Sequence, residues 1–587
     1  MSTQLFDVAT MAGRWARDRP DDVAYRIDGR RGARTLTYAE LDQLIDRTAT
    51  ALARAGLTAG TRTAVMVPPG RELVALIFAL LRLRAVPVLI DPGLGVRSMS
   101  ACFAEAAPGA FVGVVRAQVA RAVLGWGRGS VRLRLTVGPR PLWFGRLSTA
   151  LSTRPSTERP VGSPGVAPVG SPGVAHAGAP AGALSSAPDG VPSSAADGMG
   201  GLAGARWPRA DADDPALIVF TSGSTGAPKG VPLRQRHLAA QIELLGLLGS
   251  LEPGCTLYST FLPFAVAAPA IGCGAVLPRV NLRHPERTDP AAMAASIRRH
   301  GVSGLFAAPA LLDRLARHCA DRNEVLDTIR VVLTAGAPLP AGVLRRALRC
   351  LPAEADLRSV YGATESLLVS VADRAGLTET AEATARGAGT CLGAPLPGNR
   401  VRIIAITDEP IPAWSDDLLV PPGTVGEITV AGPAVSDPYL DRPRDTRLAR
   451  IDEDGAAVHR MGDLGWQDES GRLWFAGRKS ERVRTPDGDL YTDQVEPIFN
   501  ELPGVRRTAL VGVGPPGGQR PVLCVEPEPG RPRRERREIA GQVRALAPEL
   551  GEVLFHRGFP MDVRHASKIR RAVLARWAAR ELGAGER

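Results

Sequence analysis

Lysine is nearly absent from this basic chain of 587 residues. Of its 72 lysines and arginines only three are lysine, Lys229, Lys479 and Lys568, and the formal net charge is +12. Lysine carries a compact charge on a flexible stem, whereas arginine carries a broad planar fork. Because the chain uses arginine almost everywhere else, the three lysines are candidates for positions that arginine cannot fill.

The excess of basic residues raises binding to nucleic acid or to a membrane surface as alternatives. The one dense basic run, Arg531–Glu538, is interrupted by acids, and no known nucleic-acid-binding module is recognisable. A solvated basic face, with arginine enriched by GC-rich coding, is the favoured interpretation. We expect no nucleic-acid partner.

Paired cysteines and long apolar runs are also missing. The seven cysteines stand singly, which predicts buried reduced thiols rather than disulfides or a zinc site. The run Leu73–Leu81 is too short to span a bilayer, and prolines and glycines interrupt Phe261–Pro278. The first ten residues lack the pattern of a secretory signal. We therefore expect a cytoplasmic protein without a transmembrane segment.

Composition divides the chain into a large domain, residues 1–475, and a small α+β domain, residues 476–587. Short β-branched runs at Thr63–Val67 and Val86–Ile90 flank a helix-like stretch, which indicates an α/β fold. Residues 153–206 are rich in Ala, Gly, Pro and Ser and predict a disordered insert, because they cannot bury enough apolar surface to offset their ordering entropy. In the small domain we expect strands Thr508–Val513 and Val522–Val525 and helices Glu538–Leu546 and Ile569–Leu582.

The strongest chemical signal is Leu217–Val231, with the sequence LIVFTSGSTGAPKGV. An apolar strand runs into a loop of glycines and hydroxyls, and Lys229 follows before an expected helix. Backbone N–H groups, hydroxyls and a lysine together suit an anionic phosphate chain. The order differs from Gly-x-x-x-x-Gly-Lys-Ser/Thr, which disfavours a P-loop NTPase; a merely flexible loop is the other alternative. The candidate phosphate-binding residues of the loop are Thr221, Ser222, Gly223, Ser224, Thr225 and Gly226.

This loop resembles a signature of the adenylate-forming superfamily of acyl-CoA synthetases, luciferases and peptide-synthetase adenylation domains. The resemblance implies an α/β fold in which a large, multi-subdomain N-terminal domain is followed by a small, mobile α+β domain. It also implies an ATP-dependent, AMP-forming ligase that makes an acyl-adenylate and releases pyrophosphate. ATP and Mg²⁺ are the implied cofactors.

Other segments match the superfamily and take their roles from that resemblance. In Tyr361–Glu365, Tyr361 is expected to stack on adenine, Thr364 to contact phosphate and Glu365 to hold Mg²⁺. Alone, this segment is equally typical of a turn that enters a helix. An earlier segment, Thr334–Pro338, also resembles an adenine-binding segment of the superfamily. The implied nucleotide-binding residues of the two segments are Ala335, Gly336, Ala337, Pro338, Tyr361, Gly362 and Thr364.

Three further residues match the end of the large domain and the small domain. Asp463 corresponds to a carboxylate that accepts both ribose hydroxyls, and Arg478 to a residue that reaches ribose or phosphate at the hinge, where Ser480 stands at the pivot. Lys568 corresponds to the lysine that stabilises charge on the α-phosphate during attack. All three lysines thus fall inside motifs of the superfamily. The catalytic candidates are Lys229, Glu365 and Lys568.

Two departures concern the step after adenylation. Acyl-CoA ligases usually carry a histidine in the segment that corresponds to Phe261–Pro269, where this chain has Ala265 or a neighbour. They also carry a glycine along the pantetheine tunnel, where this chain has Asp487. Both losses disfavour a CoA thiol as the acceptor, and a fatty-acyl-CoA or acyl-AMP ligase stays as the alternative.

Longer strings, such as Arg472–Ser480 and Pro521–Glu526, resemble the β-lactone synthetases of bacterial long-chain olefin biosynthesis. The implied substrate is a 2-alkyl-3-hydroxy fatty acid whose own hydroxyl expels AMP, and the implied pathway partners are a thiolase, a reductase and an α/β-hydrolase that decarboxylates the lactone. We expect an acyl pocket from Phe261–Leu277 and Leu305–Leu312. Whether His237, His459 or neither accepts the hydroxyl proton stays open. An adenylate-binding regulator without catalysis is the alternative from another class.

Overall fold

The computed structural model describes residues 8–29, 32–138, 207, 209–221, 227–248, 251–278, 288–528, 530, 532–561 and 568–583. The predicted insert, residues 153–206, lies outside the described residues. Within these ranges no helix has both the length and the apolar character needed to cross a membrane.

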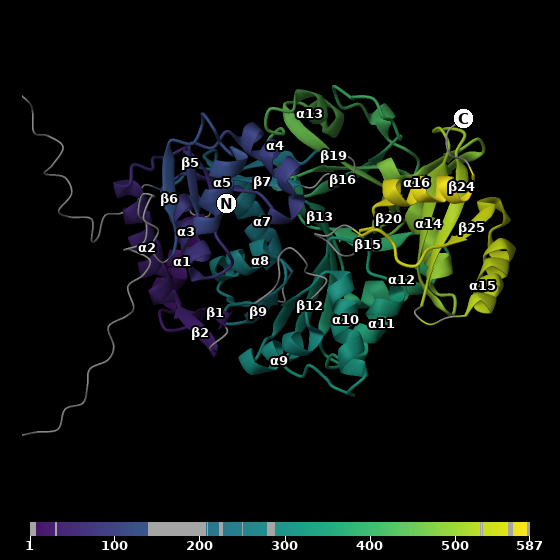
Figure 1. The fold of residues 1–587 in the computed structure, drawn as a ribbon, viewed down its shortest axis with the longest axis horizontal. Coiled ribbons are helices and arrows are strands. Elements are labelled where there is room, and N and C mark those ends of the chain that lie inside the picture. The colour runs from purple at the N-terminus through teal and green to yellow at the C-terminus, as the bar shows by residue number, and fades with distance from the viewer. Residues whose placement is uncertain are drawn as a thin grey trace, which may run out of the picture.

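A six-stranded sheet with the order β6-β5-β3-β4-β7-β8 forms in the first part of the described chain (Figure 1). Its neighbouring strands are parallel except for β7 and β8, which are antiparallel. In helix α3 all nine residues of Leu73–Leu81 are buried, so the most apolar run of the sequence is a core helix. The elements are β3 (Arg62–Met66), α3 (Arg71–Arg82), β4 (Val86–Leu89), α4 (Val96–Ala106), β5 (Ala110–Gly113), α5 (Val115–Leu124), β6 (Leu133–Thr136), β7 (Pro215–Thr221), β8 (Lys229–Arg234) and α7 (Gln235–Gly246).

Helix α2 (Tyr38–Arg54) shows how local sequence sets an element boundary. The hydroxyl of Thr37 accepts the backbone N–H of Glu40 at 3.2 Å, and the Glu40 carboxylate accepts the N–H of Thr37 at 2.9 Å. This reciprocal capping box satisfies two N–H groups that the first turn leaves without partners. The helix therefore begins at Tyr38. Helix α1 (Val8–Asp18) packs beside it.

A second sheet contains fourteen strands in the described part of the chain. From β1 through β10, β9, β11 and β12 to β13 the neighbours are parallel; from β13 onward they are antiparallel. The strands are β1 (Val23–Gly29), β2 (Gly32–Thr37), β9 (Thr256–Ser259), β10 (Gly274–Leu277), β11 (Gly304–Phe306), β12 (Val331–Ala335), β13 (Asp356–Ala363), β14 (Ser366–Ala372), β15 (Thr390–Pro395), β16 (Arg400–Ile404), β17 (Gly426–Ala431), β18 (Arg450–Glu453), β19 (Ala456–Gln467) and β20 (Leu473–Arg478).

The direction of this sheet changes at the hairpin of β13 and β14, whose turn holds Thr364 and Glu365. A predicted nucleotide-binding motif therefore lies where the parallel half meets the antiparallel half. The helices of this region are α8 (Leu262–Ala267), α9 (Pro290–His300), α10 (Pro309–Ala320), α11 (Ala341–Arg349), α12 (Arg374–Ala385) and α13 (Pro443–Ala449).

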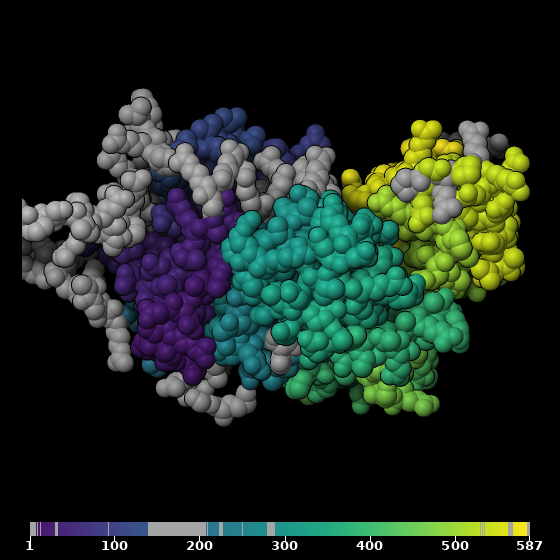
Figure 2. All heavy atoms as spheres, turned by 90° about the horizontal axis from the view of Figure 1, so that it is seen from below, coloured from purple at the N-terminus to yellow at the C-terminus, as the bar shows by residue number. Residues whose placement is uncertain are grey.

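A smaller C-terminal domain lies at one end of the large one, as Figure 2 shows in yellow. It has a three-stranded sheet, β23-β24-β25, a β21–β22 hairpin and apolar clusters of its own. The large and small domains are thus confirmed, while the boundary after residue 475 stays a prediction. The elements are β21 (Val483–Thr485), β22 (Gly488–Leu490), α14 (Thr492–Asn500), β23 (Val505–Val513), β24 (Arg520–Pro527), α15 (Arg533–Leu546), β25 (Glu552–Phe555) and α16 (Arg571–Glu581).

Two local expectations are wrong. Lys229 opens a strand, β8, and α7 follows only after Arg234. The alternative in which Tyr361–Glu365 enters a helix is also wrong, because β14 follows the turn directly. In the first place a strand precedes the expected helix, and in the second a hairpin replaces it.

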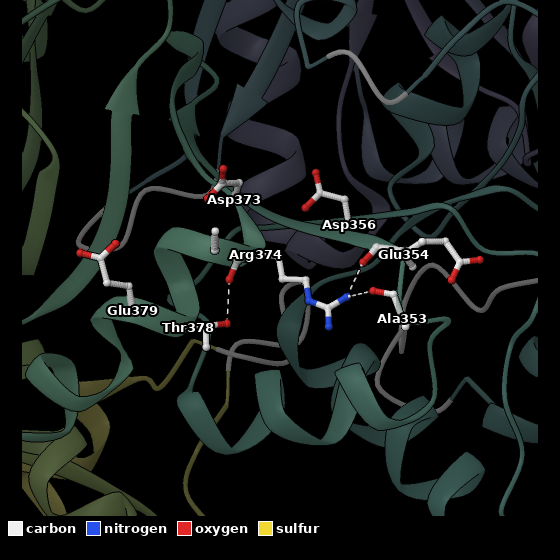
Figure 3. Close-up of a pocket in the computed structure, with 9 residues that line it drawn as sticks. Ala353, Glu354, Asp356, Asp373, Arg374, Thr378 and Glu379 are labelled. Atoms are coloured by element: carbon white, nitrogen blue, oxygen red, sulfur yellow. Dashed lines mark hydrogen bonds between the residues drawn. The ribbon is translucent and has the colours of Figure 1, made fainter.

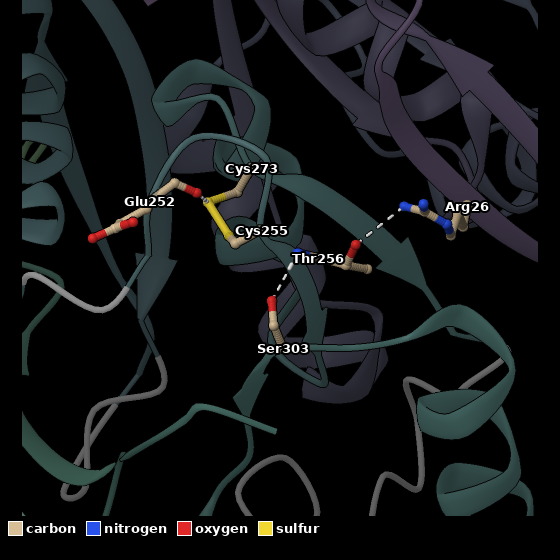
Figure 4. The surroundings of a disulfide bond; sticks show 6 residues. All are labelled: Arg26, Glu252, Cys255, Thr256, Cys273 and Ser303. Atoms are coloured by element: carbon tan, nitrogen blue, oxygen red, sulfur yellow. Dashed lines mark hydrogen bonds between the residues drawn. A yellow bond between two sulfur atoms is a disulfide. The ribbon is translucent and has the colours of Figure 1, made fainter. Parts of the chain in front are cut away.

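The cysteine prediction is wrong for one pair. Cys255 and Cys273 form a disulfide with their Cα atoms 4.8 Å apart (Figure 4). They precede the neighbouring parallel strands β9 and β10, so strand pairing brings together two residues that lie 18 positions apart. The other five cysteines are free and buried, as expected. A cytoplasmic location stays a prediction.

Gly393, on β15, offers a test of how tightly the strands of the second sheet pack. Both Gly393 and Gly60 have a φ of +73°, but a Cβ on Gly393 would overlap the carbonyl oxygen of Val371, whereas one on Gly60 meets nothing within 4 Å. We expect Gly60→Ala to cost about 1–2 kcal/mol, from the left-handed backbone alone. Gly393→Ala should cost about 3–5 kcal/mol because backbone must also move. Urea unfolding midpoints measure both; equal losses would contradict this packing.

Candidate nucleotide site

The predicted phosphate loop joins two paired strands. Strand β7 ends at Thr221 and β8 starts at Lys229, and these two residues face each other in the antiparallel register. Lys229 therefore stands at the mouth of the loop. The predicted residues Ser222, Gly223, Ser224, Thr225 and Gly226 lie outside the described residues.

The ammonium of Lys229 has two neighbours from one later segment of the chain. Its Nζ lies 3.0 Å from Asp445 Oδ1 and 4.9 Å from the centroid of the Tyr439 ring. Neither neighbour was predicted from the sequence. Tyr439 and Asp445 come more than two hundred positions after the loop, and no periodicity or motif spacing links them to it.

The two predicted adenine-binding segments emerge side by side. Strands β12 and β13 are parallel neighbours, and Ala335 pairs in register with Val360. The loop that follows, Ala335–Pro338, therefore begins next to Tyr361. Gly362, Thr364 and Glu365 continue from Tyr361 into the hairpin turn.

A buried carboxylate links this hairpin to the end of the large domain. Asp463, whose side chain is 4% exposed, accepts the Tyr361 hydroxyl on Oδ2 at 2.7 Å, and its Oδ1 lies 3.0 Å from Arg478 Nε. Asp463 and Arg478 are register partners on β19 and β20. Oδ1 has no well-aligned hydrogen bond despite its burial. An unsatisfied buried oxygen of this kind is suited to accept a ligand hydroxyl.

The charges around Asp463 come from both domains. Burial raises the pKa of Asp463, while Arg478, the Tyr361 hydroxyl and Lys568 of the small domain act to lower it. Lys568 is therefore close enough to influence the same carboxylate, across about a hundred residues of sequence. The structure thus brings Tyr361 and Arg478 into direct contact with Asp463, and the charge of Lys568 acts on the same carboxylate.

Glu365, in the turn of the hairpin, is held by a later segment of the chain. Its Oε1 accepts the Tyr439 hydroxyl at 2.7 Å, and its backbone oxygen accepts the N–H of Ser436 at 2.8 Å. Because the Tyr439 ring also faces Lys229, the predicted metal-binding and phosphate-binding residues share one neighbour.

The two candidate histidines differ in their surroundings. His237 Nδ1 accepts the backbone N–H of Arg234 at 3.0 Å, so His237 caps helix α7. His459 is buried with no hydrogen-bond partner for Nδ1 among the described residues. Burial lowers the pKa of His459 to about 4, Glu365 opposes that shift, and Arg450 and Lys229 add to it. His459 thus belongs electrostatically to the cluster around Glu365.

Lys479 is held by groups that have no predicted role in nucleotide binding. Its Nζ donates to Glu427 Oε2 and to the Thr407 carbonyl, both at 3.0 Å. Glu427 also accepts Arg460, and both of these side chains are only 1% exposed. The hinge residue Ser480 follows and is exposed. Lys479 therefore fixes the end of β20 in place.

The expected acyl segments are closely packed. The rings of Phe261, Phe264 and Phe306 lie with centroids 4.6–5.9 Å apart, and Ala265 is buried beside them. A hollow at Ala265 has a volume of about 10 Å³. A long acyl chain can enter there only if these side chains move.

Another hollow, of about 560 Å³, lies away from these segments (Figure 3). Its carboxylates are Glu354, Asp356, Asp373 and Glu379. The guanidinium of Arg374 is engaged with the carbonyl oxygens of Ala353 and Ala355 at 2.6 and 2.9 Å. None of the predicted site residues lines this hollow, and its acidic lining is unsuited to phosphates.

Residues 13–440 match the family model described as AMP-binding enzyme. The chain belongs to this family. It is an ATP-dependent, AMP-forming ligase, and the predicted superfamily and fold class are confirmed.

Two curated relatives match almost end to end. The olefin β-lactone synthetase of Xanthomonas campestris is 43% identical, over 99% of this chain and 98% of the relative. The enzyme of the same name from Stenotrophomonas maltophilia is 43% identical over 98% of both chains. These relatives support the predicted resemblance to β-lactone synthetases.

Solved structures agree on the fold. The amide bond synthetase McbA from Marinactinospora thermotolerans has a TM-score of 0.72 and 23% identity, covering 97% of this chain and 99% of that one. ATP-bound MatB from Rhodopseudomonas palustris has a TM-score of 0.71 and 20% identity, covering 98% and 99%.

The buried charges near the hinge generate a stability prediction. Glu427→Gln would leave Arg460 and Lys479 without their counter-charge, and we expect a loss of about 3–5 kcal/mol. Glu379→Gln is the matched control, because Glu379 pairs with Arg472 at 2.9 Å but is 68% exposed. It should cost no more than about 1 kcal/mol. Urea unfolding distinguishes the two, and similar midpoints would show that the buried network contributes nothing.

Proposed function

We propose that this chain is a β-lactone synthetase: it adenylates a 2-alkyl-3-hydroxy fatty acid and closes the adenylate to a β-lactone. The observation that carries the proposal is the 43% identity, over nearly the whole chain, to two enzymes named olefin β-lactone synthetase. Such an identity extends through the small domain and the hinge, which the family model of residues 13–440 does not cover.

The residues around Asp463 fit a bound nucleotide. The buried, unsatisfied Oδ1 of Asp463 and the neighbouring Arg478 suit ribose hydroxyls, which can donate to a carboxylate. We assign adenine to the Tyr361 ring and to the Ala335–Pro338 loop. We assign the phosphates of ATP to the loop from Thr221 to Gly226 and to Lys229.

Glu365 is our candidate ligand for Mg²⁺. Its carboxylate is half-buried, anchored on one oxygen by Tyr439, and lies in the same cluster as Lys229. A carboxylate beside phosphates is the usual protein contribution to a magnesium site. Bound there, Mg²⁺ would neutralise phosphate charge and orient the phosphate chain.

The reaction has two displacements. A carboxylate oxygen of the substrate attacks the α-phosphorus, the bond to the β-phosphate oxygen breaks, and pyrophosphate leaves with that electron pair. Lys568 is assigned to stabilise the negative charge that grows on the α-phosphate oxygens. The substrate's β-hydroxyl oxygen then attacks the acyl carbon, AMP leaves, and the hydroxyl proton is lost. Holding the hydroxyl close to the anhydride lowers the barrier of this ring closure by up to about 7–11 kcal/mol.

Two features support an internal hydroxyl rather than CoA as the acceptor. Acyl-CoA ligases usually carry a histidine in the segment that corresponds to Phe261–Pro269; here Ala265 or a neighbour takes that position, and Ala265 is buried in the core cluster that contains Phe264 and Phe306. Asp487 lies exposed in the β21–β22 turn, where a charged side chain is easily accommodated. Acyl-CoA ligases usually carry a glycine at this position, along the pantetheine tunnel. A fatty-acyl-CoA ligase is the second candidate.

The proposed substrate and product define a place between other reactions. A thiolase and a reductase would supply the 2-alkyl-3-hydroxy acid, and an α/β-hydrolase would decarboxylate the lactone. The cytoplasm is the compartment we propose for this sequence of steps.

Mass spectrometry of the reaction tests the proposal directly. The purified protein is given ATP, Mg²⁺ and a long-chain 2-alkyl-3-hydroxy acid, with and without CoA. We expect AMP and a product that has lost one water from the acid, whether or not CoA is present. Product formed only with CoA, as a thioester, would make the chain an acyl-CoA ligase.

Lys568 is the sharpest single-residue test of the adenylation step. We expect Lys568→Ala to slow pyrophosphate exchange by about 10²–10³-fold, since one transition-state charge is lost, while the Kd for ATP changes little. Lys568→Arg should recover only part of the rate, because its planar fork replaces a point charge. Arg570→Ala is the control, as an exposed cation two residues away. Full activity in Lys568→Ala would remove this lysine from the mechanism.

A further inference from the structure

We propose that Tyr439 is a positioning residue that couples the metal-binding carboxylate of Glu365 to the phosphate-binding ammonium of Lys229. This inference rests on the proposed function, because it takes Glu365 as the ligand for Mg²⁺ and Lys229 as a phosphate contact. It assigns a role to a residue that no sequence motif singled out.

The first contact fixes Glu365. The Tyr439 hydroxyl donates to Glu365 Oε1 at 2.7 Å. A phenol donates through one direction only, so the bond selects one orientation of the carboxylate and leaves its remaining lone pairs for another partner. Hydrogen bonds to a metal-ligating carboxylate from such neighbours commonly set both its orientation and its affinity for the metal.

The second contact holds Lys229 on the ring of the same residue. The Nζ of Lys229 lies 4.9 Å from the ring centroid, within the range of a cation–π interaction. Asp445 pairs with this ammonium at 3.0 Å. Bound phosphates would compete with Asp445 for the ammonium, whereas the ring face does not compete with an anion. Tyr439 can therefore keep Lys229 in place in both situations.

The backbone around Tyr439 is attached to both elements that it joins. Within residues 436–440, Ser436 N–H donates to the Glu365 carbonyl at 2.8 Å, and Leu440 N–H donates to the Gly230 carbonyl at 2.9 Å. Arg450 donates to the carbonyl oxygens of Ser436 and Asp437, at 2.6 Å each. The segment thus crosses from the β13–β14 turn to the start of β8, with Tyr439 between its two anchors.

The two contacts use different parts of one side chain, so two substitutions separate them. Tyr439→Phe removes the hydroxyl and keeps the ring, whereas Tyr439→Leu removes both. Tyr25→Phe is the matched control, because it also deletes a buried tyrosine hydroxyl, one that donates to the Val266 carbonyl at 2.8 Å. Its unfolding midpoint gives the stability loss to be expected from the chemistry of the substitution alone.

The experiment measures ATP binding by isothermal titration calorimetry, in Mg²⁺ and in EDTA, together with the Mg²⁺ concentration that half-saturates pyrophosphate exchange. For Tyr439→Phe we expect that concentration to rise about 10–100-fold, as for other residues that orient a metal ligand, with an unchanged Kd in EDTA. For Tyr439→Leu we expect an additional rise in the EDTA Kd of about 2–5-fold, from the lost ring contact. Tyr25→Phe should alter neither quantity.

Glu365→Gln is measured in the same way, so that a failure of the role proposed for Tyr439 can be told from a failure of the assignment of Mg²⁺ to Glu365. If Glu365→Gln shifts the Mg²⁺ dependence and Tyr439→Phe does not, Tyr439 only fills space and the inference is overturned. If neither variant shifts it, the assignment of Mg²⁺ to Glu365 fails as well. A shift in Tyr439→Phe that Tyr25→Phe reproduces would trace the effect to lost stability and would also overturn the inference.

Discussion

The burial of one carboxylate, that of Asp463, constrains the candidate site more than any other interaction. A buried carboxylate is costly unless hydrogen bonds or an opposite charge compensate it. Tyr361 and Arg478 supply that compensation from β13 and from β20, on either side of the change in strand direction. The same requirement fixes Arg478 immediately before the chain turns into the short 3₁₀ segment Lys479–Glu481 and the small domain. The site and the hinge therefore share one anchor.

The three lysines show how far a compositional argument reaches. Their rarity pointed to positions with special chemistry. Lys229 faces Thr221 at the predicted phosphate loop, and the charge of Lys568 acts on Asp463. Lys479 differs from them, because it neutralises Glu427 together with Arg460 and ties the end of β20 to the Thr407 carbonyl.

Hydrogen-bonding context also separates residues that the sequence leaves equivalent. His237 and His459 are both buried and both have a lowered pKa. His237 is committed to the backbone at the start of α7, whereas the pKa of His459 responds to the charges of Glu365, Arg450 and Lys229. Cys255 and Cys273 differ from the five free cysteines for a similar reason, since adjacent parallel strands start at the two residues that follow them. The partner of His237 is three positions away, whereas the two disulfide cysteines lie 18 positions apart.

The sequence by itself determined the elements whose signals are local. Short apolar runs predicted β3, α3 and β4, and the two strands and two helices predicted for the small domain overlap β23, β24, α15 and α16, although α15 begins earlier, at Arg533. The elements β21, β22, α14 and β25 were not predicted. The motifs predicted the family and most of the candidate site, because glycines, hydroxyls and charged residues within a few positions of one another define each loop. Tertiary structure alone decided three other features: the β7–β8 hairpin whose connection is the phosphate loop, the disulfide, and the contacts of Tyr439 with both Glu365 and Lys229. The disulfide and the contacts of Tyr439 join residues that only strand order and register bring together, and pairing between distant strands leaves no periodic trace in the chain.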